Sequence, residues 1–166
     1  GVDEFFADAA TLIGNMKHGT ERIAGIVAQL RNYVRQNDEA QWEDADVNRV
    51  AQNAATMVRT QLQRAVEKFD VSLADDLPRV RMSPGRIEQV IINLLINAGH
   101  AMKGQGAVTV SITLSDGTQH IRVTDSGPGI APEVRERLFQ PFVTTKARGT
   151  GLGLSTAKRL AAAHGG

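Results

Sequence analysis

The sequence contains no cysteine among its 166 residues. Disulfide bonds and thiolate zinc sites are therefore excluded, and the composition is compatible with a reducing compartment. The sequence also lacks any apolar run that approaches the roughly 18 residues needed to span a bilayer. Its first residues show no signal-peptide pattern. A membrane segment is therefore not expected within this sequence.

A strong charge imbalance is absent as well. Nineteen lysine and arginine residues against eighteen acidic ones give a formal net charge of +1. Nucleic-acid-binding proteins usually concentrate basic residues in a patch, so no nucleic-acid partner is expected. The composition of 42% hydrophobic and 22% charged residues is typical of a globular protein. The length allows one domain with a core and a short appendage.

The first segment carries a narrow seam of helical period. Its residues recur at alternating spacings of three and four, the heptad pattern of nearly parallel packing in a coiled coil or bundle. The seam consists of Ile13, Met16, Thr20, Ile23, Val27, Leu30 and Val34. We therefore predict a long bundle helix within residues 1–40, with a helix that folds back on its own domain as the alternative.

A polar stretch at residues 35–46 has the composition of a linker. Asp46 is a candidate N-cap for the helix that follows, and Ser83-Pro84 has the N-cap and first-turn residues of another. Asp116-Gly117 is a hairpin turn sequence. The pattern predicts helices at 47–65, from 83 onward and at 152–163, and strands at 69–73, 78–82, 108–114 and around 121–123. These elements predict an α+β fold, a two-layer α/β sandwich with a mixed, mostly antiparallel sheet, over residues 45–166.

The helix that opens at Ser83-Pro84 contains the run VIINLLINA, which is apolar except for two amides. Burying an amide without a partner costs about 1–3 kcal/mol. At about 100° per residue, Asn93, Asn97 and His100 fall on one narrow stripe with apolar residues on both sides. This arrangement indicates the lining of a pocket, although amides that cap loop backbone inside the fold would produce the same pattern.

A second motif combines a carboxylate with two glycines. In VTDSGPGI a predicted strand ends at Asp125, and a tight turn with Gly127 and Gly129 follows. A carboxylate accepts a hydrogen bond from the exocyclic amine of adenine and repels the carbonyl oxygen of guanine. The motif therefore suits recognition of an adenine base, although the same composition is common in ordinary turns.

A third motif runs from Thr144 to Leu154 and leads directly into a predicted helix. Glycines before a helix N-terminus expose backbone N–H groups and the positive end of the helix dipole, which together favour a phosphate. Lys146 and Arg148 add positive charge at its entrance. The spacing Gly-x-Gly-x-Gly is common in flexible loops, and it does not match the dinucleotide fingerprint.

Together these motifs resemble the catalytic ATP-binding domain of bacterial sensor histidine kinases. This domain has the Bergerat-type fold that type II topoisomerases, the chaperone Hsp90 and the mismatch-repair protein MutL share. The order and spacing of four motifs agree, and the resemblance covers essentially the whole chain. The N, G1, F and G2 boxes are matched by NLLINA from Asn93, DSGPGI from Asp125, LFQPF from Leu138 with the following TTK, and GTGLGL from Gly149.

The resemblance implies ATP and Mg²⁺ as cofactors. It makes Asn97 the metal ligand through its amide oxygen, Asn93 a support of the same phosphate and metal site, and Asp125 the reader of the adenine amine. Asn93 and Asn97 are thereby also its candidate catalytic residues. The other nucleotide-binding residues that it implies are His100, Gly127, Gly129, Ile130, Lys146, Arg148, Gly149, Thr150, Gly151, Leu152 and Gly153.

Asn93 occupies the position at which ATP-hydrolysing members of the wider family typically carry a glutamate. An amide cannot act as a general base, because it takes up no proton near pH 7. The resemblance therefore implies transfer of the γ-phosphate to a histidine rather than efficient hydrolysis. The alternatives are an ATPase module of the same fold and a non-catalytic fragment that only binds ATP or a partner.

The resemblance also implies a domain organisation and partners. Residues 1–40 are similar to the second helix of the dimerisation and phosphoacceptor bundle, whose first helix is absent. His18 is interpreted as a solvent-facing residue and His164 as a structural one. We expect a phosphoacceptor-histidine helix, a response regulator receiver domain and a homodimer through the N-terminal helix as partners. A cytoplasmic location is expected, whether or not the parent kinase is membrane-anchored. The catalytic domain at 45–166 is expected to be truncated at its C-terminus.

Overall fold

The computed structural model describes residues 41–102, 104–144, 146 and 149–166, together with residues 14, 16, 19 and 20. Most of the predicted bundle helix, as well as Arg148, lies outside this set. Within the described part of the chain, no helix has both the length and the apolar character that a membrane span requires.

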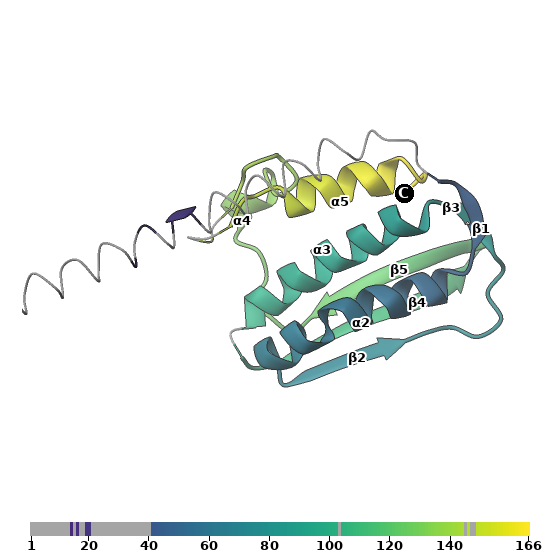
Figure 1. The fold of residues 1–166 in the computed structure, drawn as a ribbon, viewed down its shortest axis with the longest axis horizontal. Coiled ribbons are helices and arrows are strands. Elements are labelled where there is room, and N and C mark those ends of the chain that lie inside the picture. The colour runs from purple at the N-terminus through teal and green to yellow at the C-terminus, as the bar shows by residue number, and fades with distance from the viewer. Residues whose placement is uncertain are drawn as a thin grey trace, which may run out of the picture.

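The fold consists of helices packed on one face of a three-stranded sheet (Figure 1). The strand order is β2-β4-β5, in which β2 and β4 are parallel while β4 and β5 are antiparallel. The strands of this sheet are β2 (Lys68–Ser72), β4 (Ala107–Ser115) and β5 (Thr118–Asp125). Two short strands, β1 (Glu43–Ala45) and β3 (Val80–Met82), form a separate antiparallel pair.

Two long helices cover the sheet, and a third lies beside them. In Figure 1, α3 runs between α2 and α5, and α5 lies on the side of α3 away from α2. A single helical turn, α4, lies between β5 and α5 in the sequence. The bounds are α2 (Val47–Ala65), α3 (Pro84–Met102), α4 (Pro132–Arg135) and α5 (Gly153–Ala162). The predicted two-layer α/β class is confirmed.

Helix α2 begins and ends where the sequence provides the required groups. The side chain of Asp46 accepts a hydrogen bond from the backbone N–H of Asn48 at 2.9 Å, as an N-cap residue does. At the other end, the N–H of Val66 closes the last turn on the carbonyl of Leu62 at 2.9 Å. The prediction of a helix over residues 47–65 is confirmed.

The β4–β5 hairpin forms the sheet side of the hydrophobic core. Asp116 and Gly117 both have positive φ, at 52° and 74°, as a two-residue hairpin turn that matches the twist of its strands requires. Because side chains alternate along a strand, β4 directs every second residue toward the helices. Val108, Val110 and Ile112 are at most 1% exposed. The core therefore lies between this strand and the buried faces of α2 and α3.

The prediction of a linker over residues 35–46 is wrong at its C-terminal end. Residues 43–45 form β1, which pairs with β3 in antiparallel register from Glu43 opposite Met82 to Ala45 opposite Val80. Of the three β1 residues only Ala45 is buried. A three-residue strand of this composition is too short to show the alternation by which strands are detected in a sequence.

Gly99 sets how closely α3 can approach α2. A Cβ atom added at Gly99 would lie 2.6 Å from Cδ2 of Leu62, whereas one added at Gly85 in the same helix would meet nothing within 4 Å. We expect Gly99→Ala to lower the free energy of unfolding by about 1–3 kcal/mol through overpacking. Gly85→Ala, the matched control, should be neutral or stabilising by up to about 1 kcal/mol. Urea denaturation of both variants measures the difference, and equal stabilities would contradict this account.

Candidate functional site

The polar stripe of α3 meets a lysine that is distant in sequence. The Nζ atom of Lys146 donates a hydrogen bond to Oδ1 of Asn97 at 2.7 Å. The same ammonium lies 3.4 Å from Nδ1 of His100, which accepts from it when the ring carries its proton on Nε2. Three of the residues predicted from the sequence, Asn97, His100 and Lys146, thus lie together. The amide oxygen of Asn97 accepts a hydrogen bond from the charged ammonium of Lys146.

Asn93 lies one turn before Asn97 and has partners of its own. Its Oδ1 accepts a hydrogen bond from Nε2 of Gln89 at 3.0 Å. A Cβ atom added at Gly153 would lie 3.9 Å from both Cγ and Oδ1 of Asn93, so the start of α5 passes close to this amide. Sequence reasoning missed Gln89, although its position four residues before Asn93 places it on the same face of the helix.

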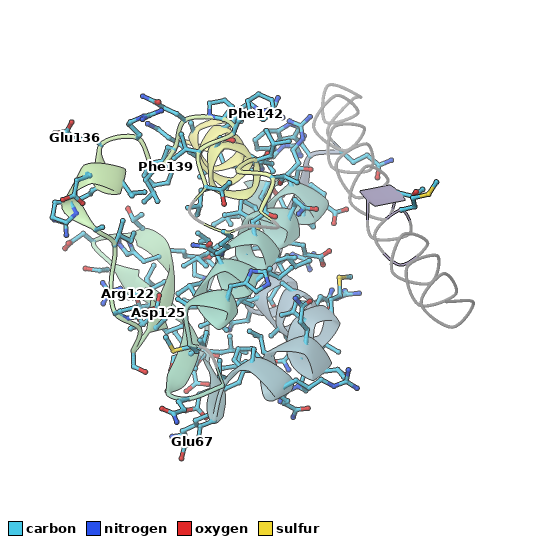
Figure 2. All side chains as sticks on the ribbon, turned by 90° about the vertical axis from the view of Figure 1, so that its left-hand side faces the viewer. Glu67, Arg122, Asp125, Glu136, Phe139 and Phe142 are labelled. Carbon is cyan, nitrogen blue, oxygen red and sulfur yellow. The ribbon has the colours of Figure 1, made fainter. Side chains whose placement is uncertain are left out.

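The Asp125 motif is built around one backbone hydrogen bond. Oδ1 of Asp125, at the end of β5, accepts from the N–H of Gly127 at 2.9 Å. Oδ2 has no hydrogen-bond partner among the described residues. The loop packs against the end of α3, because Oγ of Ser126 lies 3.7 Å from Sδ of Met102. Figure 2 shows Asp125 on the strand side of the molecule, facing solvent.

The glycine segment, residues 142–153, leads into α5. A backbone hydrogen bond joins Phe142 near its start to Gly151 near its end. Phe142 has φ of +66°, which is rare for a bulky residue and marks a constrained backbone. Its N–H donates to the carbonyl of Gly151 at 3.0 Å. Gly151 has φ of +69°, and a Cβ atom there would overlap the backbone of Phe142. A side chain at position 151 would therefore open this contact.

Helix α5 begins at Gly153, two residues after Gly151. The N–H of Thr156 donates to the carbonyl of Leu152 at 3.0 Å, and Oγ of Ser155 donates to the same oxygen. Leu152 is 4% exposed and anchors the turn in the core. The N–H groups of the first turn are left for other partners, as at any helix N-terminus.

A cavity of about 290 Å³ opens beside the glycine segment. It is bounded by α4 and the Phe142 region, and no residue of the asparagine stripe or of the Asp125 loop contributes to it. In Figure 2, Phe139 and Phe142 lie together near α5, away from Asp125. The cavity is lined by Glu133, Val134, Arg137, Phe142, Val143 and Thr144.

Burial lowers the pKa values of two basic side chains beside Asn97. Partial burial, and secondly the positive charge of Lys146, lower the pKa of His100 below its ordinary value of 6.5. Partial burial also lowers the pKa of Lys146 below 10.5. Both shifts disfavour the protonated, positively charged forms of these two side chains.

We expect the imidazole signals of His100 in an NMR titration to give a pKa below 6.5. Because the folded state then binds fewer protons than the unfolded state, His100 destabilises the fold increasingly as the pH falls below 6.5. Lys146→Met should raise this pKa only in part, since burial is the larger cause. A pKa of 6.5 or higher for His100 would contradict its partial burial beside Lys146.

Comparison with known proteins identifies the family. Residues 82–166 match the model of the histidine kinase-, DNA gyrase B- and HSP90-like ATPase family. The chain belongs to this family. The matched range contains α3, the Asp125 loop, the glycine segment and α5, so the family assignment and the candidate site rest on the same part of the structure.

Relatives within the family are sensor kinases. The chain is 33% identical over 175 residues to the sensor histidine kinase ZraS of Salmonella typhi, a match that covers 100% of this chain and 37% of that protein. It is 36% identical over 149 residues to the C4-dicarboxylate transport sensor protein DctB of Rhizobium meliloti, covering 89% of this chain and 24% of DctB. The chain thus spans well under half the length of these curated relatives.

Solved structures of histidine kinases have the same fold. Full-length ShkA in complex with AMPPNP superposes with a TM-score of 0.74 at 26% identity, covering 89% of this chain and 32% of ShkA. The histidine kinase AdeS of Acinetobacter baumannii gives a TM-score of 0.69 at 26% identity, covering 92% of this chain and 73% of AdeS. The Bergerat-type α/β fold expected from the sequence motifs is therefore confirmed.

Proposed function

We propose that this chain is the Mg²⁺- and ATP-binding catalytic domain of a sensor histidine kinase, and that it transfers the γ-phosphate of ATP to a histidine on a separate bundle helix. The observation that carries the proposal is the convergence of Lys146 on Asn97 and His100. It supports a site where an amide oxygen of α3 meets positive charge from the glycine segment. The family assignment and the sensor-kinase relatives support the same function.

Asn97 fits the role of metal ligand because its amide oxygen already accepts a cationic group. The Lys146 ammonium lies 2.7 Å from Oδ1, so this oxygen is open to a positively charged partner. No group of three or more histidine, cysteine or acidic side chains that could hold a metal exists among the described residues. This suits Mg²⁺, which is usually held by one or two protein oxygens, by substrate phosphates and by water. Bound there, Mg²⁺ supplies charge neutralisation to the phosphates.

The chain's own groups then position the nucleotide. With ATP bound, the positive charges of Lys146 and Arg148 would offset the charge of the phosphates. Gly149, Gly151 and Gly153 would let the backbone of the glycine segment approach the phosphates. The buried side chain of Leu152 anchors that segment, and Thr150 is a further candidate contact of the nucleotide. The N-terminus of α5, a ten-residue helix, adds the positive end of its dipole. His100 faces the phosphates from α3, one turn beyond Asn97.

The base lies at the other end of the site. The Oδ2 atom of Asp125 would accept a hydrogen bond from the adenine amine, and the N–H of Gly127 orients the carboxylate through its hydrogen bond to Oδ1. Gly129 has φ of +76° with open space where a Cβ would stand, so the backbone there can lie against the ring. Ile130, which is 42% exposed, provides an apolar contact for the base.

Asn93 favours phosphoryl transfer over hydrolysis. Its amide accepts a hydrogen bond from Gln89, lies near the start of α5 and cannot remove a proton from water. A neutral imidazole attacks with a nitrogen lone pair and needs no such base. Catalysis then consists of positioning and charge neutralisation, as in other phosphoryl transfers.

The test supplies the acceptor in trans. The chain is incubated with γ-labelled ATP, Mg²⁺ and the phosphoacceptor bundle of the ZraS relative, with the same bundle carrying His→Gln at its acceptor position as the control. We expect an acid-labile, alkali-stable label on the first bundle only. Multiple-turnover phosphate release without labelling would instead support an ATPase module. ATP binding without either reaction would support a non-catalytic fragment.

Two partners follow from the same proposal. The phosphohistidine would pass its phosphoryl group to the receiver domain of a response regulator, and the N-terminal helix would join two chains in a bundle. Analytical ultracentrifugation tests the second point directly. A strict monomer at high protein concentration would exclude a homodimer formed by this chain alone.

A further inference from the structure

His164 joins three segments of the chain through its ring. Nδ1 lies 2.8 Å from the carbonyl oxygen of Leu160, and Nε2 lies 3.1 Å from the backbone nitrogen of Ser83. The ring stacks on Trp42, with centroids 4.5 Å apart and planes inclined by 29°. A carbonyl can only accept and a backbone N–H can only donate. The ring is therefore neutral, with its proton on Nδ1 and with Nε2 as the acceptor.

Ser83 is the residue from which α3 starts. Its carbonyl accepts hydrogen bonds from the N–H groups of Arg86 and Ile87, both at 3.1 Å. Ser83 is 6% exposed, and Pro84 after it has no N–H. The imidazole of His164 thus provides the acceptor for a buried N–H group at the N-cap of α3. A buried backbone N–H without an acceptor is rare in folded proteins because water cannot replace the bond.

The contact lies at one end of a helix pair whose other end forms the nucleotide site. Figure 1 shows α3 and α5 side by side. The C-terminus of α5 lies near β3, the strand that directly precedes α3 in the sequence. In the middle, an apolar cluster of Val90, Ala157 and Leu160 joins the two helices. At the far end, Gly153 of α5 passes Asn93 of α3. The hydrogen bond from the N–H of Ser83 to His164 is a polar contact at this end of the pair.

We propose that His164 is a positioning residue for the nucleotide site, acting through the N–H of Ser83 to set α3 against α5. The proposal rests on the proposed ATP site, because α3 carries Asn93 and Asn97 while α5 begins at the glycine segment. His164 itself makes no contact with the nucleotide. When the Ser83 bond is lost, the helix pair can slide, and the amides of α3 no longer face the start of α5 at a fixed distance.

The experiment separates the two ring nitrogens with a matched pair of amides. His164→Gln places an oxygen near the position of Nε2 and keeps an acceptor for Ser83. His164→Asn reaches only the Leu160 carbonyl from the position of Nδ1. We expect His164→Asn to weaken Mg²⁺–ATP binding by roughly tenfold in calorimetry, with His164→Gln restoring most of the affinity. Ile112→Val, a buried change in β4 that leaves the His164 and Ser83 groups unaltered, controls for general loss of stability.

Each outcome decides between the two proposals. If the unmodified chain binds no ATP, the proposed function fails, and the His164 proposal fails with it. If that chain binds ATP and His164→Asn binds equally well, the His164 proposal alone is overturned. An equal loss in His164→Asn and Ile112→Val at matched stability would also overturn it, since the effect would then be general. Independently of any variant, ring ¹⁵N shifts must show the proton on Nδ1, and a proton on Nε2 would exclude the Ser83 bond.

Discussion

Asn97→Ala is expected to remove the Mg²⁺-dependent part of ATP binding. In the unmodified chain, affinity measured by calorimetry should be higher with Mg²⁺ than with a chelator. In the variant the two values should become about equal, with Mg²⁺–ATP binding weaker by roughly 100-fold, because even outer-shell partners of metal ligands contribute 10–100-fold. The physical reason is the loss of the oxygen that now accepts from Lys146 at 2.7 Å.

The controls isolate the oxygen from the rest of the side chain. Asn97→Asp keeps a hard oxygen and should retain the metal dependence, although its negative charge will hold Lys146 more strongly. Asn53→Ala removes an exposed amide of α2 that donates to Glu88, and it should leave ATP binding unchanged. A full Mg²⁺ effect in Asn97→Ala, with the fold verified by circular dichroism, would exclude Asn97 as the metal ligand.

The helices and the hairpin could be predicted because their signals are local. Asp46 caps α2 within two residues, and the Ser83-Pro84 pair opens α3. The Asp116-Gly117 turn carries the two positive φ values that its sequence predicts. In each case the residues that decide the structure are neighbours in the chain, so one sequence contains the whole signal.

The parts that could not be predicted depend on contacts between distant residues. Lys146 and Asn97 are 49 positions apart, and His164 and Ser83 are 81 positions apart. The helical periodicity of the sequence predicts the polar stripe of α3, but it does not indicate which lysine contacts that stripe. The sequence predicts only a structural role for His164, because a lone histidine near a helix end does not show which N–H group it contacts. The strand β1 was missed because three residues are too few to show alternation and its partner β3 lies 35 residues away.

Asp125→Asn is expected to change which purine the site prefers. The Gly127 N–H holds one side-chain oxygen of residue 125 at 2.9 Å, and the substituted amide still has one oxygen to place there. Its NH₂ group must then take the position of Oδ2, where it donates instead of accepting. That group opposes the adenine amine and matches the carbonyl oxygen of guanine. The preference for ATP over GTP should therefore fall, and it can reverse.

The size of this effect follows from the charge that is removed. A hydrogen bond to a charged group contributes roughly 1.5–3 kcal/mol, which corresponds to a change of about ten- to hundredfold in the ATP-to-GTP ratio. Competition calorimetry with the two nucleotides measures it, and Asp75→Asn in the exposed loop after β2 is the matched control. Equal weakening of both nucleotides would mean that Asp125 acts on the fold of its loop. A loss confined to ATP would instead show that the carboxylate contacts the base, since Gly127 keeps the loop in place in both proteins.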